Sequence, residues 1–287
     1  MHVSILKMND IKSIIENDYF LKVLNVKKVN SNVFHITTSN DDYILKVHHH
    51  LCKKYFHEFS TIYRMASANN LSPQMIPTKQ NFLINKKYGT FFSVHKFLKN
   101  EHIIFDLKSL SKRLSKLHRK LFELKITVLD NHFDRLFDVR EKAIEYGYIS
   151  HLPMIDNLMS FLEKANKQII HSDLHMNNLI FHNNCIYFLD FDSSTYSHTI
   201  FDVVFLAFRC VSFEQNKIHE FVALYNQFNP PNKIDTRYII PALIYLILQR
   251  ILFIMVKKEQ GNLQYMYDLG NQKKYLSYIT KSIASHN

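Results

Sequence analysis

The sequence contains the stretch Ile170-His171-Ser172-Asp173-Leu174-His175-Met176-Asn177-Asn178-Leu179, followed by Ile186-Tyr187-Phe188-Leu189-Asp190-Phe191-Asp192. It holds the Asp173 carboxylate, the Asn178 amide five positions later, and the Asp190 carboxylate twelve positions after that. An aspartate can orient a hydroxyl group, while an asparagine and a second aspartate can hold one or two Mg²⁺ ions over nucleotide phosphates. This spacing therefore indicates phosphoryl transfer.

Apolar runs flank these polar groups, as is typical of short buried strands. The runs are residues 169–170, 179–181 and 186–189, with Asn183-Asn184 between the last two. Catalytic side chains commonly lie on loops that a rigid scaffold holds in place. We therefore expect short strands, two of them joined by a hairpin turn, with the polar groups on the adjoining loops.

The H-x-D-x-x-x-x-N segment and the following hydrophobic-D-F-D segment resemble the aminoglycoside phosphotransferase and choline kinase group, small-molecule kinases that share the protein-kinase fold. The usual form in that group is H-G-D-L-H-x-x-N, from which this chain departs mainly by Ser172 in place of glycine. The resemblance implies that Asp173 is the catalytic base or hydroxyl-orienting group, and that Asn178 and Asp190 are metal ligands. It also implies that Asp202 braces the catalytic loop.

The N-terminal third fits the same resemblance. Lys46 lies in an expected strand over residues 41–47 and matches the kinase lysine that binds the α and β phosphates. Glu58, on the next helical segment, is expected to pair with Lys46. The resemblance extends over about the whole chain, from the hairpin that begins at Val26 to at least Asp202.

Three further residues are candidates for nucleotide contact by the same resemblance. Ser31 lies in the turn of a hairpin over residues 26–29 and 33–38, where kinases carry a glycine-rich loop, although this turn has no glycine. His95 and Phe97 lie where a strand over residues 91–98 runs into a linker, which is the position of the adenine-binding hinge.

The resemblance implies an α+β, bilobal, protein-kinase-like fold. We expect a nucleotide-binding lobe over residues 1–95, with a small antiparallel sheet and one main helix, and a mostly helical catalytic and acceptor-binding lobe over residues 96–287. Helical periodicity and end signals predict helices over residues 9–16, 51–68, 107–124, 133–146, 155–165, 200–210, 217–228, 236–258 and 263–283.

An apolar run and the three cysteines bear on the location of the protein. Residues 239–256 are nearly all apolar, but Gln249-Arg250 interrupts the run, and an arginine at mid-span costs about 2.5 to 3.5 kcal/mol. A buried helix is therefore expected, with no membrane partner. The chain start has no signal-peptide core, and no metal or disulfide pattern joins the three cysteines Cys52, Cys185 and Cys210. A cytoplasmic location is expected.

The net charge of +11 bears on the partners. From residue 214 onward, where acceptor helices are expected, nine Lys or Arg residues stand against five Asp or Glu residues. A polycationic acceptor would need carboxylates to retain it, so a neutral or anionic small molecule is favoured. The basic residues are dispersed, which argues against nucleic acid as a partner. The sequence leaves the oligomeric state open.

Histidines permit another interpretation. His171, Asp173 and His175 can form a metal cluster on one strand face, but a metallohydrolase or oxygenase leaves Asn178 and Asp190 without a role. We expect His171 to be a buried brace bonded to nearby backbone, and His175 either to contact phosphate or to pack. The tract His48-His49-His50 is expected to be a solvated strand edge, since three consecutive residues cannot face one ion.

The sequence thus predicts a Mg²⁺-dependent O-phosphotransferase that moves the γ-phosphate of ATP or GTP to a hydroxyl of a small molecule. A protein kinase is a weaker alternative, because such enzymes carry H-R-D and an activation segment ending in A-P-E, whereas only nine residues separate Asp192 from Asp202. A nucleotide-binding scaffold with weak or no turnover is the other alternative, which the missing glycines permit.

Overall fold

The computed structural model describes residues 8–48, 55–87, 89–101, 106–126, 129, 132–211 and 214–284. The chain forms two compact units. Unit 1 consists of Met1–Phe105, Glu123–Val128 and Asn177–Ser194, and unit 2 of Asp106–Phe122, Leu129–Met176 and Thr195–Asn287. Unit 1 therefore includes a segment from far along the chain, and the lobe boundary expected after residue 95 stays a prediction.

Unit 1 is built on a six-stranded antiparallel sheet. Strands β1 (Val23–Lys28), β2 (Val33–Thr38) and β3 (Asp42–His48) pair in order, and β3 pairs with β6 (Thr90–Lys96). Two short strands, β4 (Met75–Ile76) and β5 (Ile84–Lys87), follow one another along the other edge of β6. Neither was predicted, because strands this short, one of them mostly polar, carry no readable alternation.

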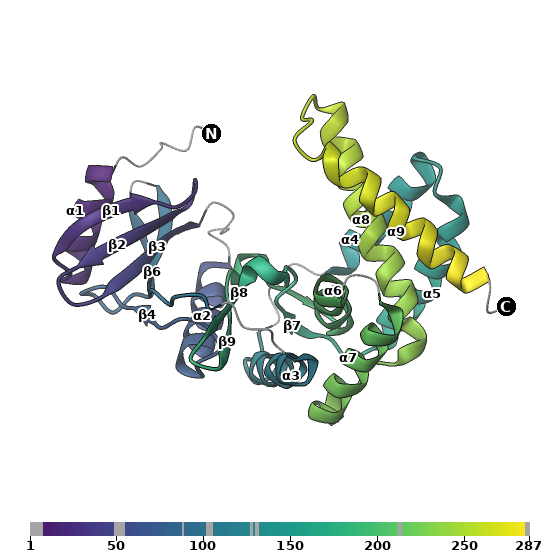
Figure 1. Cartoon of the computed structure of the whole chain (residues 1–287), viewed down its shortest axis with the longest axis horizontal. Coiled ribbons are helices and arrows are strands. Elements are labelled where there is room, and N and C mark those ends of the chain that lie inside the picture. Colours follow the sequence, from purple (N-terminus) through teal and green to yellow (C-terminus); the bar gives the residue numbers. More distant parts are fainter. Residues whose placement is uncertain are drawn as a thin grey trace. The chain divides into compact units, whose positions relative to one another are not determined.

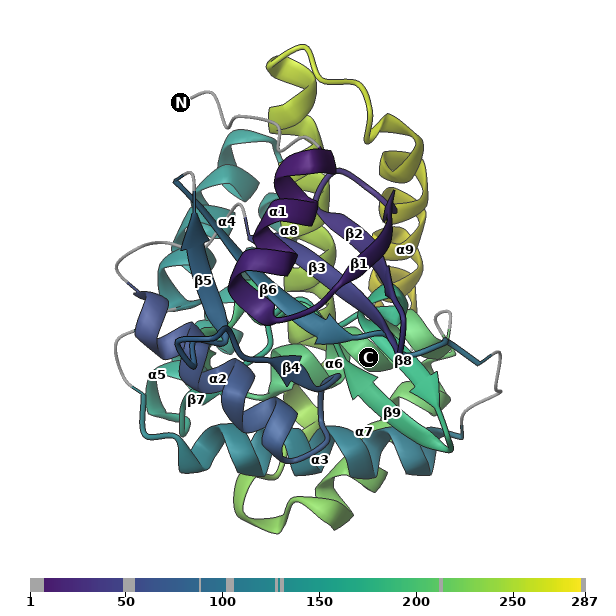
Figure 2. The ribbon, with the colours of Figure 1, turned by 90° about the vertical axis from the view of Figure 1, so that its left-hand side faces the viewer.

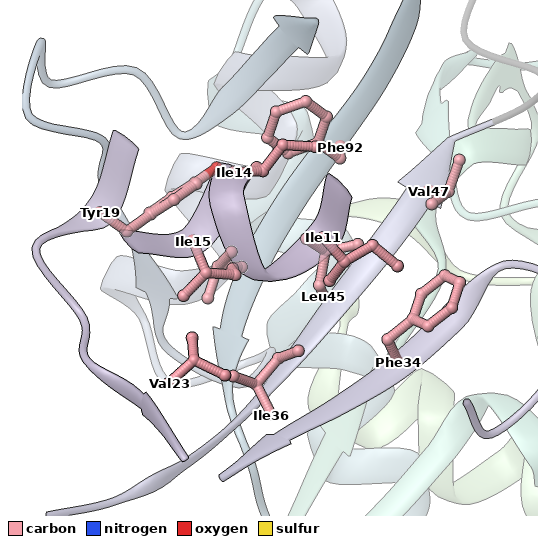
Figure 3. Close-up of a cluster of buried hydrophobic side chains, with 11 residues drawn as sticks. Ile11, Ile14, Ile15, Tyr19, Val23, Phe34, Ile36, Leu45, Val47 and Phe92 are labelled. Atoms are coloured by element: carbon pink, nitrogen blue, oxygen red, sulfur yellow. The ribbon is translucent and has the colours of Figure 1, made fainter. Parts of the chain in front are cut away.

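Helix α1 (Met8–Tyr19) covers one face of this sheet (Figure 2). Its apolar residues recur at helical spacing and pack on inward-facing strand residues (Figure 3): the buried cluster is Ile11, Ile14, Ile15, Tyr19, Val23, Phe34, Ile36, Leu45, Val47, Phe92 and Val94. Each fully buried side chain of this size contributes about 1.5 to 3 kcal/mol. Since strand residues alternate between faces, Leu45 and Val47 on the α1 side leave Lys46 on the opposite face.

Helix α2 (Phe56–Ala68) and a hairpin complete unit 1. The predicted hairpin is confirmed as β8 (Leu179–His182) and β9 (Cys185–Phe188). Its turn residues Asn183 and Asn184 have φ of +48° and +57°, the backbone of a two-residue hairpin turn that asparagine tolerates. Helix α2 packs against β4 and the short 3₁₀ segment Phe191–Ser193. Residues 51–54 of the expected helix lie outside the described residues.

Unit 2 is mostly helical, and its helices match the predictions to within a few residues at each end. They are α3 (Leu107–Glu123), α4 (His132–Glu145), α5 (Leu152–Lys164), α6 (Ile200–Val211), α7 (Gln215–Phe228), α8 (Ile239–Glu259) and α9 (Met266–Ala284). Two short strands, β7 (Gln168–Ile170) and β10 (Thr195–Ser197), pair with each other. Helix α8 packs against α4, α5, α6 and α9 (Figure 1).

Helix α8 is the central core helix of unit 2. Within the described residues, Thr236–Glu259 is the one helical stretch long and apolar enough to cross a membrane, and 61% of its most apolar window is buried. Its buried residues include Ile244, Leu248 and Ile251. The prediction of a buried helix is confirmed.

Candidate active site

Lys46 lies among acidic and phenolic oxygens in unit 1. Its Nζ is 2.6 Å from Asp190 Oδ1, 2.9 Å from Asp192 Oδ2 and 3.2 Å from the Tyr63 hydroxyl. The Asp190 side chain is 41% exposed and that of Asp192 only 9%. The structure thus brings together Lys46, the lysine predicted to bind phosphate, and Asp190, one of the predicted metal ligands. Their roles in binding stay predictions.

Asp192 is the most heavily bonded carboxylate of this cluster. Its Oδ1 accepts from the Tyr63 hydroxyl at 2.7 Å, and its Oδ2 lies 2.8 Å from His48 Nδ1. Burial alone would raise the pKa of Asp192, but the hydrogen bond from His48 and the neighbouring charge of Lys46 outweigh it and hold the pKa well below its usual range. Asp192 is therefore an anion held by its neighbours.

His48 contradicts the expectation of a solvated strand edge, because it is buried. Its Nε2 lies 2.8 Å from Ser93 Oγ, which in turn lies 2.7 Å from His95 Nε2. Burial lowers the pKa of His48, and burial with the charges of His48 and Lys46 lowers the pKa of His95 to about 3. The prediction of a solvated edge was wrong for His48, because this residue alternates with Val47 along the strand and so faces the same side as Lys46. His49 and His50 lie outside the described residues.

The expected pair of Lys46 with Glu58 is not formed. Within the part of the chain that the structure describes, Glu58 Oε2 is buried without a hydrogen-bond partner. The three protons of the Lys46 ammonium already face Asp190, Asp192 and Tyr63, and Tyr63 belongs to the same helix as Glu58. The correction is that the lysine takes its carboxylate partners from the segment 190–192.

The other candidate nucleotide contacts have different settings. Ser31 is exposed in the β1–β2 turn, which the Asn30 side chain closes by accepting from the backbone N–H of Asn32 at 2.8 Å. The His95 side chain points into the buried chain of polar groups, so only its backbone is a candidate for adenine contact. The backbone N–H of Phe97 donates to the Asp42 carbonyl at 2.9 Å. All three assignments stay predictions.

Asn178 directly precedes β8 and Asp190 follows the end of β9 by two positions, so both lie at the open end of the hairpin. Asn178 is buried, and its carbonyl accepts from the backbone N–H of Leu189 at 2.9 Å. Asp190 follows with a left-handed φ of +62°. No group of three His, Cys, Asp or Glu side chains suited to a metal ion occurs in the described residues. An amide oxygen and one carboxylate fit Mg²⁺, which commonly takes few protein ligands and completes its shell with phosphates and waters.

In unit 2, Asp173 lies on a loop that a buried network holds. His171 is fully buried and accepts at Nδ1 from the Asp173 backbone N–H at 3.4 Å, which confirms its expected bracing role. Asp202 accepts from the backbone N–H groups of His171 and Ser172 at 2.7 and 2.8 Å, and lies 3.0 Å from His118 Nε2. Burial raises the pKa of Asp202, but the bond and charge of His118 prevail and lower it. The predicted brace is confirmed.

His175 lies near Asp173 and forms no ligand cluster with it. Its Nε2 is 3.7 Å from Asp173 Oδ1, and the third member, His171, is turned to the backbone. The metal cluster read from these three residues is therefore not supported by their arrangement.

The end of helix α6 brings the basic group of Arg209 within electrostatic reach of Asp173. Cys210 Sγ lies 3.5 Å from Met176 Sδ, three residues after Asp173. The Arg209 guanidinium lies 5.0 Å from the Phe205 ring. Although the residue as a whole is exposed, desolvation of the guanidinium and then the charge of Arg250 lower the pKa of Arg209, against the charges of Asp268 and Asp173. Arg250 itself pairs with Asp268 at 2.9 Å.

Comparison with known proteins agrees with this architecture. The profile of the phosphotransferase enzyme family matches residues 22–232. A search of curated proteins found no match. The structure resembles that of the AMP-bound spectinomycin phosphotransferase APH(9)-Ia, with a TM-score of 0.71 and 14% identity, over 96% of this chain and 95% of that one.

Two more solved structures show the same likeness. The amicoumacin kinase hAmiN, in complex with AMP-PNP, Ca²⁺ and Ami, gives a TM-score of 0.72 at 13% identity, over 98% of this chain and 94% of that one. The choline kinase LicA from Streptococcus pneumoniae gives 0.67 at 16% identity, over 95% and 98%. At these identities the likeness shows the fold, and the predicted α+β, kinase-like fold is confirmed.

Proposed function

We propose that this chain, which belongs to the phosphotransferase enzyme family, moves the γ-phosphate of ATP or GTP to a hydroxyl of a small molecule with the help of Mg²⁺. The solved structures that it resembles, among them a spectinomycin phosphotransferase and a choline kinase, support this proposal. The observation that carries the proposal is the ion pair of 2.6 Å between Lys46 and Asp190, which are 144 positions apart. In a kinase site, a lysine and an acidic metal ligand act together on the nucleotide phosphates, so their proximity here supports the proposal.

Each residue has a distinct task in this proposal. Lys46 binds the α and β phosphates, Asn178 and Asp190 would hold Mg²⁺, and Asp173 orients the acceptor hydroxyl and accepts its proton. The chemistry that Mg²⁺ supplies when bound is neutralisation of charge on the phosphates. Catalysis on this view is positioning plus charge stabilisation, so the network around Asp202 matters because it fixes the loop of Asp173.

We further propose a neutral or anionic acceptor. Solved relatives include complexes with spectinomycin and hygromycin B. In this chain, Arg209 and Arg250 lie near enough to each other for their charges to interact, and Arg209 is also within electrostatic reach of Asp173. Within the described residues, Asp268 forms a direct ion pair with Arg250 and acts on Arg209 only through its charge. Two guanidinium groups repel a polycation and favour a ligand that brings no further positive charge.

The test is a turnover assay on a panel of amino alcohols, sugars, nucleosides, hydroxy acids and aminoglycosides, with ATP or GTP and with or without Mg²⁺. We expect nucleotide consumption to depend on Mg²⁺ and on one neutral or anionic acceptor. Turnover with aminoglycosides alone would contradict the acceptor class. Nucleotide binding without turnover would favour the scaffold alternative, which the turn without glycine at Asn30–Asn32 permits.

A cytoplasmic location belongs to the same proposal. Cys185 is exposed and Cys210 half-buried, and both are free thiols, as is usual in a reducing compartment. The nucleotide donors are abundant there. Fractionation of cells that express the tagged full chain tests this location.

A further inference from the structure

The two carboxylates that meet Lys46 differ in their other bonds. Asp190 is the more exposed, and among the described residues Lys46 is its one ion-pair partner. Asp192 is nearly buried. It forms an ion pair with Lys46 and hydrogen bonds with the Tyr63 hydroxyl and the His48 imidazole. Only Asp190 therefore retains an exposed side from which a cation could be bound.

We propose that Asp192 is the positioning residue that fixes Lys46 for the nucleotide phosphates, in the place expected for Glu58, and that His48 and Tyr63 in turn fix Asp192. The inference rests on the proposed function for its nucleotide, and on the side-chain contacts within unit 1 for its geometry. It assigns different tasks to the two acidic residues of the segment 190–192.

Strand geometry explains why these residues meet. Figure 3 shows Leu45 and Val47 of β3 in the cluster beneath helix α1. Lys46 and His48 are two positions apart on the same strand, so they share the opposite face. Tyr63 comes from α2, and its hydroxyl lies 3.2 Å from Lys46 Nζ as well as 2.7 Å from Asp192. The Tyr63 hydroxyl also accepts from the backbone N–H of Phe191 at 3.2 Å, which ties the segment 190–192 to the helix.

The support for Asp192 continues into the interior of the sheet. His48 is backed by Ser93, and Ser93 by His95, so four polar side chains follow one another through hydrogen bonds. Buried polar groups are stable only when such chains are complete, because an unpaired buried donor or acceptor costs about 1 to 3 kcal/mol. This series of hydrogen bonds therefore holds the Asp192 carboxylate in one position and, through it, the ammonium group of Lys46.

The first experiment measures the affinity of the full-length protein for AMP-PNP with Mg²⁺ by calorimetry. Asp192→Asn should weaken binding about tenfold or more, since it removes the charge that holds the ammonium of Lys46 in place. Glu58→Gln should weaken it less. The matched control is Asp18→Asn, which removes a Lys–Asp pair of 3.2 Å with Lys87 elsewhere in unit 1 and should leave affinity within about twofold.

A double-mutant cycle then tests whether Lys46 and Asp192 act as a unit. Lys46→Met combined with Asp192→Asn should cost about as much as the larger single loss, whereas Lys46→Met combined with Glu58→Gln should show additive losses. The opposite pattern would return the positioning role to Glu58 and overturn the inference.

A second readout needs no nucleotide, so it separates failure of this inference from failure of the proposed function. Acetic anhydride labelling of Lys46, followed by peptide mass spectrometry, should be several-fold faster in Asp192→Asn than in wild type, and unchanged in Asp18→Asn. His48→Ala should also speed labelling, while His48→Asn, which can still donate to Asp192, should restore the wild-type rate. Equal labelling in wild type, Asp192→Asn and His48→Ala would overturn the inference even if the protein binds nucleotide normally.

Discussion

The carboxylate of Asp202 accepts a hydrogen bond of 2.7 Å from the backbone N–H of His171, on the loop that carries Asp173. Both residues are buried, so the bond is shielded from water. A side chain on helix α6 thereby fixes the backbone of a loop thirty-one positions earlier. The conformation of the loop that carries Asp173 therefore depends on the Asp202 carboxylate.

Asp202→Asn should destabilise the protein. The amide replaces an acceptor by a donor opposite the N–H groups of His171 and Ser172 and leaves His118 without its carboxylate. Each buried donor left without its acceptor costs about 1 to 3 kcal/mol, which is measured as a loss in the free energy of unfolding in urea. Asp138→Asn, which removes an exposed pair with Lys142, is the control and should cost less than about 1 kcal/mol. Equal losses would show that the Asp202 network contributes no stability.

Ser172→Gly should stabilise the protein. Ser172 has a left-handed φ of +68°, and its buried hydroxyl has no hydrogen-bond partner among the described residues. Relief of the backbone strain is worth about 1 to 2 kcal/mol, and the hydroxyl adds to it, against a glycine entropy cost of about 0.5 to 1 kcal/mol. A gain of about 1 kcal/mol is expected in urea unfolding. A loss of stability would mean that the hydroxyl has a structural task.

Asp173→Asn should lower kcat by about 10² to 10⁴, the range typical of general acid–base groups. Nucleotide affinity should change little, because the residue is assigned to the acceptor hydroxyl. Calorimetric titration with AMP-PNP beside the turnover assay, on one preparation, tests both statements. If binding and turnover fall in equal proportion, Asp173 acts on the nucleotide or on the fold.

Asp190→Asn should abolish most Mg²⁺-supported turnover while the protein stays folded. Asparagine tolerates the left-handed backbone at this position, where φ is +62°, so the change tests charge rather than conformation. Residues that only support metal ligands already cost about 10- to 100-fold when mutated, so a loss above about 100-fold is expected for a ligand. Turnover is measured against Mg²⁺ concentration; a full rate at any Mg²⁺ concentration would contradict the assignment.

His198 should make stability fall in acid. It is buried, its Nδ1 accepts from the backbone N–H of Ile200 at 3.1 Å, and burial followed by the charge of His118 lowers its pKa from 6.5 to about 4. Between pH 6.5 and about 4 the unfolded chain takes up a proton that the folded one refuses, so stability decreases as pH falls through this window and is fully present above it.

The lowered pKa of His198 corresponds to a loss of about 3 kcal/mol in the free energy of unfolding. Urea unfolding at pH 7.5 and at pH 4.5 measures this difference. His198→Asn keeps an acceptor for Ile200 without the titrating ring, so it should reduce the difference between the two pH values. An unchanged difference would assign the acid sensitivity to other groups.

The sequence alone predicted the helices of unit 2 and the strands β1, β2, β3 and β6, because their apolar residues recur with a clear period. It also predicted the brace at Asp202. It missed β4, β5 and β10, which have two to four residues each and are held by tertiary pairing rather than by their own pattern.

The partners of Lys46 could not be predicted by the same means. Glu58 and Tyr63 lie on one helix, and which of them meets the lysine depends on how α2 is rotated against the sheet. The burial of His48 likewise depends on contacts with Asp192 and Ser93, far apart in the chain. One signal for these contacts was available in the sequence. Asp192 follows Asp190 by two positions, and His48 follows Lys46 by two positions on β3, so each acidic residue has a possible basic partner at the same spacing.

The β8–β9 hairpin has a consequence for insertions and deletions. Its ladder runs from Leu179 opposite Phe188 to His182 opposite Cys185, and Asn178 and Asp190 extend from its open end. With the two-residue turn kept, adding one residue to each strand preserves the register, whereas a single added residue would turn one strand over and send its side chains to the other face. Functional variants should therefore lengthen or shorten the segment between Asn178 and Asp190 by even numbers of residues, and a library of hairpin insertions sorted for turnover would reveal that parity.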